Sequence, residues 1–287
     1  MRKRNKPIVA PTDQNAGQHA SALVRGLQIL RAFTPADASL GNQELIERTG
    51  LPKATVSRLT YTLVGLGYLI YDPALGRYRI GPATVSLGYS GLSTSAVIYM
   101  AKPLMQALAI ETGAAVAMGM RDGLEMVYVA NCRPETPVTL RLNVGSRLPI
   151  WQTSMGLAYL AGMAPATRGK VVGQLVAAYP DLRDKILNAV EQGLDCHARH
   201  GFVTSVGGWY SYINDVGVPF MPSDGSQLVA ITCGGIKDLV PADECLSKFG
   251  PKLKELSQEL QGRLTGAIGP STQYQTMGTP RGFVDAG

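Results

Sequence analysis

The break at Gly50-Leu51-Pro52 constrains the fold of this chain most, because it separates two short segments whose apolar residues recur at helical spacing. These segments are residues 42–49 and 52–65, and a further helix is predicted before them over residues 21–33, with Ser21 as its N-cap. Pro52 suits the first turn of a helix, since its missing N–H would be unpaired there. Three helices in this order predict a helix-turn-helix. The residues of the first helix expected to face the core are Leu23, Leu27 and Leu30.

A hairpin is predicted directly after the third helix. Residues 68–71 and 78–80 are rich in Tyr, Ile and Leu, and the segment between them contains Pro73 and Gly76. Two strands that follow a helix-turn-helix form a wing, so residues 21–81 are predicted to be a winged helix-turn-helix domain.

The third helix has an apolar face and a polar face. The residues predicted to be buried are Val56, Leu59, Leu63 and Leu66. The opposite face carries small, hydroxyl, basic and phenolic side chains, namely Lys53, Ala54, Ser57, Arg58 and Tyr61. Such a face suits the major groove, where Arg binds guanine with two hydrogen bonds, Ser donates or accepts, and Ala permits close approach. The alternative is a winged helix that serves only packing or dimerisation.

The net charge of the chain is concentrated in its first 80 residues. The whole chain has 27 Lys and Arg and 21 Asp and Glu, for a net charge of +6. Residues 1–80 contain 11 basic and five acidic residues, whereas residues 81–287 contain 16 of each. A basic module joined to a neutral one predicts a polyanion partner for the first module. A flexible basic arm over residues 1–20 explains part of this excess.

The remainder of the chain is predicted to be a linker helix at residues 82–96, an α+β domain at residues 97–265 and a flexible tail at residues 266–287. Strands are expected at 114–121, 125–131, 138–143, 202–206, 216–221 and 227–233. Helices are expected at 153–162, 167–178, 181–193 and 241–265. This order predicts helices packed on a mainly antiparallel sheet.

Four stretches in this order and spacing resemble the IclR family of bacterial transcriptional regulators, over about residues 21–265. They are Ser21–Leu30, Glu47–Leu59, Gly76–Pro82 and Val144–Ile150. The resemblance implies an N-terminal winged helix-turn-helix, a linker helix and a C-terminal GAF-like effector-binding domain. It also implies homodimers or homotetramers that bind pseudo-palindromic double-stranded operator DNA.

The resemblance also implies a pocket for a small organic effector between the sheet and the helix near residue 154. The positions carried over, with the aromatic Trp209 beside them, are Leu140, Leu148, Ser154, Met155, Ser205, Trp209, Asp215, Thr232 and Gly234. The family often has a cysteine where Asp215 stands and serines where Thr232 and Gly234 stand. A carboxylate facing the ligand disfavours a small anion unless it is turned away or protonated. We therefore expect a larger, partly aromatic effector. The alternative is that the aromatic residues near 209–212 are core or dimer contacts.

Other chemistry finds little support in the sequence. There is no Gly-x-Ser-x-Gly elbow, P-loop, dinucleotide-binding glycine pattern or His-Glu-x-x-His, so no catalytic residues and no cofactor are predicted. The best metal candidate, Cys196-His197 with His200, lacks further ligands, so no metal is expected. The two strand cysteines, Cys132 and Cys233, are expected to be buried. Neither a membrane span nor a secretory signal is apparent, which predicts a cytoplasmic protein without a membrane partner.

These patterns lead to three hypotheses. The first is a ligand-responsive transcriptional regulator in which the residues that hold DNA phosphates are Arg25, Thr55 and Arg77. The second is an enzyme that acts on a small molecule in the C-terminal domain. The third is a protein-interaction adaptor that binds neither DNA nor ligand.

Overall fold

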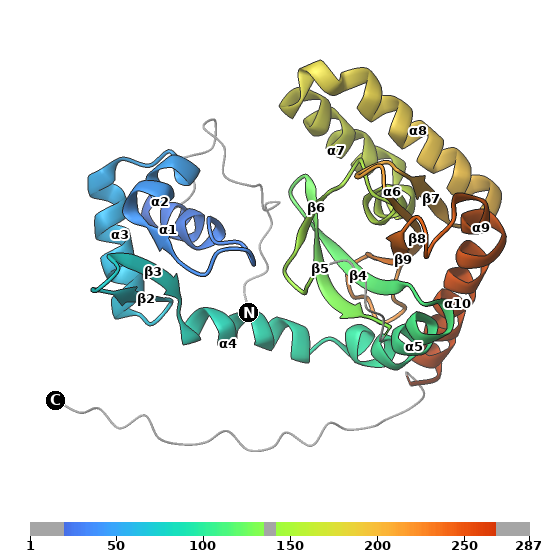
Figure 1. Cartoon of the computed structure of the whole chain (residues 1–287), viewed down its shortest axis with the longest axis horizontal. Helices are drawn as coiled ribbons and strands as arrows, with labels where there is room; N and C mark the ends of the chain where they lie inside the picture. Colours follow the sequence, from blue (N-terminus) through green and yellow to red (C-terminus); the bar gives the residue numbers. More distant parts are fainter. Residues whose placement is uncertain (1–19, 135–141, 268–287) are drawn as a thin grey trace, which may run out of the picture.

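The structure is a computed structural model that describes residues 20–134 and 142–267. The predicted strand at 138–143, the predicted arm at 1–20 and the predicted tail at 266–287 therefore lie mostly outside the described residues. The described chain forms two lobes joined by α4 (Pro82–Ser93), which runs alone between them (Figure 1).

The N-terminal lobe is a winged helix-turn-helix, as the sequence predicts. Its helices are α1 (Ser21–Arg31), α2 (Asn42–Thr49) and α3 (Lys53–Gly65). Its antiparallel sheet has the order β1-β3-β2, formed by β1 (Leu40–Gly41), β2 (Leu69–Asp72) and β3 (Arg77–Ile80). The two-residue strand β1 was too short to predict from the sequence.

The tight turn between α2 and α3 depends on Gly50. This residue ends α2 in the left-handed conformation, with φ of 67°, and its N–H donates to Ile46 O at 2.8 Å. Glycine adopts this conformation without steric cost. At the start of α2 the Gly41 N–H donates to Glu44 Oε2 at 2.7 Å, so both ends of this short helix have partners.

Two predicted apolar faces differ from the structure. Leu23 and Leu27 of α1 are 63% and 49% exposed, while Ile29 is fully buried. Apolar residues occur on more than one side of α1, so periodicity alone did not select the side that packs on α3. In α3, the expected core residue Leu66 is 62% exposed because the helix ends at Gly65, whereas Thr60 is fully buried.

The C-terminal lobe is built on one antiparallel sheet with the strand order β6-β5-β4-β9-β8-β7. The strands are β4 (Ala115–Asp122), β5 (Glu125–Cys132), β6 (Arg147–Pro149), β7 (Val203–Val206), β8 (Ile213–Phe220) and β9 (Val229–Ile236). One face carries α5 (Ala96–Thr112), α9 (Ala242–Glu244), a π-helical turn (Cys245–Phe249) and α10 (Gly250–Ala267). The other face carries α6 (Ser154–Gly162), α7 (Pro165–Ala178), the 3-10 turn Pro180–Leu182 and α8 (Arg183–His200). The predicted α+β fold with helices on an antiparallel sheet is confirmed.

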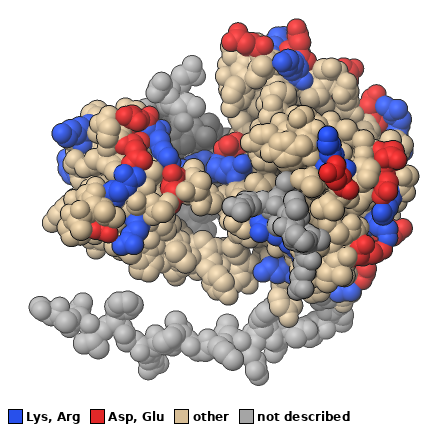
Figure 2. Space-filling model, in the orientation of Figure 1, with Lys and Arg blue, Asp and Glu red and all other residues tan. Residues whose placement is uncertain are grey.

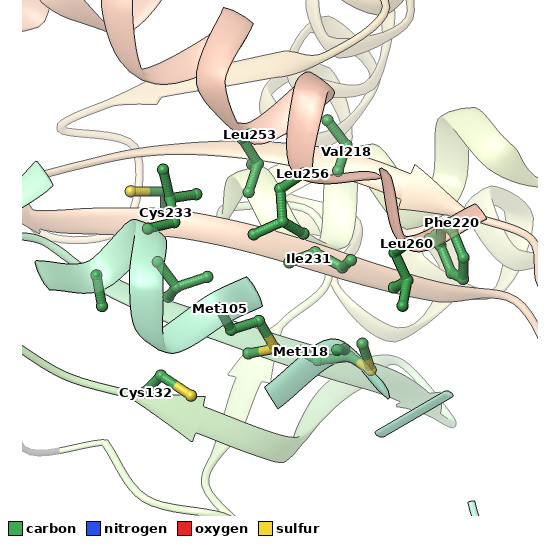
Figure 3. Close-up of a cluster of buried hydrophobic side chains, with 14 of the residues drawn as sticks. Met105, Met118, Cys132, Val218, Phe220, Ile231, Cys233, Leu253, Leu256 and Leu260 are labelled. Atoms are coloured by element: carbon green, nitrogen blue, oxygen red, sulfur yellow. The ribbon is translucent and has the colours of Figure 1, made fainter. Parts of the chain in front are cut away.

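The larger core lies between the sheet and the helices α5 and α10 (Figure 3). Met105 of α5 and Leu256 of α10 meet Ile231 of β9 in this layer. Cys132 and Cys233 are 7% and 0% exposed, which confirms that they are buried small side chains. Alternate residues of the same strands face the opposite layer, so the sheet is buried on both sides.

The two lobes are joined by an ion-pair chain as well as by α4. Arg31 Nη2, at the end of α1, lies 2.7 Å from Asp122 Oδ2 at the tip of the β4–β5 hairpin. Arg147 Nη1 of β6 lies 2.9 Å from the same oxygen. The helix α4 itself has no buried residue and presents three strongly exposed apolar side chains, Val85, Leu87 and Tyr89.

Candidate nucleic-acid interface and ligand cavity

The polar face of α3 is open to solvent. Lys53, Ala54, Ser57 and Arg58 are exposed, and Tyr61 is 82% exposed. Figure 2 shows a group of Lys and Arg atoms at the outer edge of the N-terminal lobe. This face can therefore reach a groove of DNA without any rearrangement of the lobe.

The buried side of α3 is tied to the wing. Thr60 Oγ1 lies 2.9 Å from Val56 O and 3.2 Å from the hydroxyl of Tyr78 in β3. On the other side of the lobe, Arg48 donates two hydrogen bonds to Asp37, at 2.6 and 2.9 Å, and this pair holds the pKa of Asp37 well below its usual range. These contacts tie α3 to the wing and tie α2 to the segment that follows α1.

The residues expected to hold phosphates occupy three different settings. Arg25 is exposed on α1, and Thr55 is half-buried in the first turn of α3. Arg77 lies at the start of β3 and is already engaged, since its Nε donates to Ser39 Oγ at 2.8 Å and its Nη2 lies 2.7 Å from Glu44 Oε2. Arg79 was missed by the sequence reasoning. It is exposed, and its nearest carboxylate, that of Asp72, is 3.7 Å away.

A small cavity of about 30 Å³ lies between the sheet and the start of α6. The residues that the sequence associated with the effector and that line it are Leu148, Met155, Trp209, Asp215, Thr232 and Gly234. Residues not anticipated there are Ala115, Tyr128, Asn131, Leu142, Thr153 and Ile213. Ser205 lines a separate surface hollow beside α8, and Leu140 lies outside the described residues. This volume holds about one or two water molecules, so a larger ligand requires the lining residues to move apart.

Glycine residues let the start of α6 lie close to the sheet. A Cβ on Gly217 would lie 2.6 Å from Ser154 O, and a Cβ on Gly234 would lie 2.6 Å from the Cβ of Asp215. Gly217 and Asp215 alternate along β8 and therefore face the same helix. Gly217 therefore lets the backbone of α6 approach β8, and Gly234 leaves room for the side chain of Asp215.

Asp215 is bound to the first turn of α6. Its Oδ2 accepts hydrogen bonds from Ser154 N at 3.1 Å and from Ser154 Oγ at 2.5 Å. A carboxylate near a helix N-terminus is stabilised by the free N–H groups and the helix dipole. Burial nevertheless dominates and raises the pKa of Asp215 to about 6.

The aromatic residues after β7 do not all belong to the cavity. Trp209 lines it, and the Trp209 and Tyr210 ring centroids are 4.4 Å apart. Tyr210 and Tyr212 are stacked with centroids 5.5 Å apart, and they are 45% and 50% exposed. Trp209 is therefore the only one of these three rings that lines the cavity, while the other two extend the aromatic surface outward.

Neither a metal centre nor a membrane span is found in the part of the chain that the structure describes. No three His, Cys, Asp or Glu side chains within residues 20–134 and 142–267 are grouped to hold a metal ion. In the same residues no helix combines the length and the apolar character that crossing a bilayer requires.

The fold and these two sites define a transcriptional regulator, in which a winged helix-turn-helix precedes a domain with a small cavity beside the start of α6. Residues 22–73 match the IclR helix-turn-helix domain, and residues 90–261 match the bacterial transcriptional regulator IclR C-terminal domain. The chain belongs to the IclR family of bacterial transcriptional regulators.

Curated and solved relatives agree with this assignment. The HTH-type transcriptional regulator TsaQ1/TsaQ2 of Comamonas testosteroni is 35% identical over 251 residues, which cover 87% of this chain and 90% of that protein. The crystal structure of an IclR family transcriptional regulator from Brucella abortus is 36% identical and has a TM-score of 0.79, covering 90% of this chain and all of that one. The matched families and these relatives are regulators, so the chain is a regulator and the enzyme hypothesis is not supported.

A more distant relative carries a ligand. An IclR homolog from Microbacterium hydrocarbonoxydans, complexed with 4-hydroxybenzoate, is 20% identical with a TM-score of 0.67, and the match covers 85% of this chain and 99% of that one. At this identity the likeness shows the shared fold alone.

Proposed function

We propose that this protein is an effector-responsive regulator that binds double-stranded operator DNA as a homo-oligomer. In this proposal residues 21–81 bind DNA, residues 82–96 form the linker and residues 97–265 bind the effector. The observation that carries the proposal is the solvent-exposed polar face of α3, whose opposite side contacts the wing through Thr60 and Tyr78. Because it acts on the bacterial chromosome, its place of action is the cytoplasm.

The α3 side chains divide into base-reading and phosphate-holding groups. Arg58 and Ser57 lie one turn into the helix, where a bidentate guanidinium contact to guanine discriminates bases by about 1–3 kcal/mol. Ala54 permits close approach of the helix, and Tyr61 contacts the groove further along. Phosphates are held by residues near the helix start and on the neighbouring elements, namely Arg25, Lys53, Thr55 and the wing arginines Arg77 and Arg79. Arg77 can take this role only by leaving Glu44.

The test is fluorescence anisotropy of the full chain on DNA from upstream of its own gene and on scrambled DNA, at two salt concentrations. Arg58→Ala is expected to lose discrimination between the two DNAs, whereas Lys53→Ala is expected to weaken both and to lower the salt slope by about one. Arg183→Ala, which removes an exposed arginine of α8, is the matched control. Equal affinity of wild type for both DNAs at both salt concentrations would refute specific operator binding.

A second copy of the chain is the partner that we propose for the exposed apolar side chains of the linker region. Leu87 of α4 is 63% exposed and Tyr99 of α5 is 80% exposed, and association with a second copy would remove this apolar surface from water. Light scattering should give a dimer or tetramer for the wild type and a smaller species for Leu87→Lys. A monomeric wild type at working concentration would contradict this part of the proposal.

The ion-pair chain between the lobes supplies the proposed coupling route. Leu148 lines the cavity, and its neighbour Arg147 pairs with Asp122, which in turn pairs with Arg31 of α1. A ligand that shifts β6 would change this contact and thereby the position of the DNA-binding lobe. The ligand can do so only through different affinities for the two arrangements. Operator affinity that is unchanged at saturating ligand would refute the coupling.

The proposed effector is a small organic compound with an aromatic ring. Trp209 and Tyr128 line the cavity, and a protein of this fold has been solved with 4-hydroxybenzoate. Screening operator affinity against small aromatic compounds tests this part.

A further inference from the structure

Asp215 is the one charged side chain among the described residues that line the cavity. Asp215 contributes a carboxylate whose Oδ2 is bound by Ser154. Asn131 also lines the cavity, and its Nδ2 donates to Leu142 O at 2.5 Å, which fixes the orientation of the amide. Asn131 Oδ1 is buried and has no hydrogen-bond partner among residues 20–134 and 142–267. A buried acceptor without a donor is costly, so a ligand that supplies a donor is favoured here.

The place where a carboxylate ligand would bind is already occupied by the protein itself. The N–H groups at the start of α6 are the natural anion site of this cavity, and Ser154 N donates to Asp215 instead. An incoming carboxylate would have to displace Asp215 or lie beside it, and two carboxylates in a buried site repel each other.

Positive charge that could neutralise an anionic ligand is absent from the described lining of the cavity, which contains no Lys, Arg or His. Arg133, just outside that lining, donates to Leu142 O and to Asn143 Oδ1. The other titratable groups near Asp215 are Tyr128, Cys233 and Cys245, and burial raises the pKa of each, so all three are neutral at pH 7.

We propose that the effector of this cavity is a compound that presents a hydrogen-bond donor, a hydroxyl or a protonated nitrogen on an aromatic ring, to Asp215, and that it is not held through a carboxylate. This inference rests on the proposed function, because it takes the cavity to be the effector site. Leu148, Met155 and Trp209 form the apolar and aromatic wall that would hold the ring, and they would have to move apart to admit it, because the cavity has a volume of about 30 Å³.

Three probes of nearly the same shape separate the charge of the ligand from its size: benzamidine, benzamide and benzoate. Isothermal titration calorimetry on the full chain at pH 7.5 is expected to give the tightest binding for benzamidine and the weakest for benzoate, with at least a tenfold difference between these two. Asp215→Asn keeps the side-chain shape and removes the charge, so it is expected to abolish this difference. Asp215→Ser provides a second neutral variant, and Asp238→Asn, which changes an exposed carboxylate, is the matched control.

The preference for benzamidine is also expected to fall at pH 5, where Asp215 is mostly protonated. Benzoate binding as tight as that of benzamidine, or no saturable binding of any of the three probes, would overturn the inference. The operator measurement is independent of this one. If the chain binds its operator specifically but shows no preference for benzamidine over benzoate, only the proposed class of ligand is refuted. If the chain shows no operator specificity but still prefers benzamidine, the proposed function is refuted and the inferred class of ligand stands.

Discussion

Replacing Asp215 with Asn should stabilise the protein at neutral pH. Burial raises the pKa of this carboxyl from 3.8 to about 6, a difference of about two units. At 1.36 kcal/mol per unit, the ionised carboxylate costs the folded state up to about 3 kcal/mol. Because the folded-state pKa is the higher one, this cost is absent below about pH 4, grows between pH 4 and 6 and is complete above that range.

The Asn side chain keeps an oxygen that accepts the two hydrogen bonds from Ser154, so the variant should remove the charge and little else. We expect the unfolding temperature of the full chain at pH 8 to rise by up to roughly 6–12 °C, at about 2–4 °C per kcal/mol for a domain of this size. At pH 4 wild type and variant should unfold at the same temperature. Differential scanning calorimetry across this pH range, with Asp238→Asn as the control, measures both values. A stabilisation that does not depend on pH, or a destabilised variant at pH 8, would refute the reasoning.

Three further predictions concern other contacts. Gly217→Ala should destabilise the C-terminal lobe by more than about 2 kcal/mol in chemical denaturation, because its Cβ would lie 2.6 Å from Ser154 O. Gly173→Ala in α7, where no heavy atom lies within 4 Å of the added Cβ, serves as the milder comparison. Thr60→Val should leave the buried Tyr78 hydroxyl without its partner and cost about 1–3 kcal/mol, while Thr62→Val on the exposed side of α3 should cost less. Asp122→Asn should change the unfolding free energy by about 1 kcal/mol or less, because the ion pairs of Asp122 are exposed. The same variant should reduce the effect of ligand on operator affinity, and an unaltered ligand effect would count against the coupling route.

The helix-turn-helix could be predicted from the sequence because its signals are local. Residues 42–49 are helical in both the prediction and the structure, since Gly50 stops the helix in a conformation that glycine favours. The face of α1 could not be predicted in the same way. Its leucines cover more than one side, and which side packs on α3 is decided by contacts that are distant in sequence.

The cavity could be predicted only in part, for the same physical reason. Leu148, Met155 and Thr232 were found through the family resemblance, whereas Tyr128 and Asn131 carry no local signal and depend on the register of β5. The engagement of Arg77 with Glu44 likewise joins segments that are 33 positions apart. Arg79 could have been found, because strand alternation places it on the same side as Arg77 when Tyr78 is buried.

The unfavourable features of the C-terminal lobe are concentrated around one cavity. Asp215 is a buried carboxylate that costs stability, and Asn131 Oδ1 and Arg133 Nε, at the end of β5, are buried polar atoms without partners in the described chain. The opposite face of the sheet, by contrast, carries the apolar core formed by Met105, Ile231 and their neighbours. A fold selected for stability alone would pair or remove such groups, whereas a ligand site keeps them because the ligand supplies the missing partners. A bound donor at Asp215 would relieve its cost and stabilise the state that holds the ligand, which is the differential affinity that a ligand-controlled change in operator binding requires.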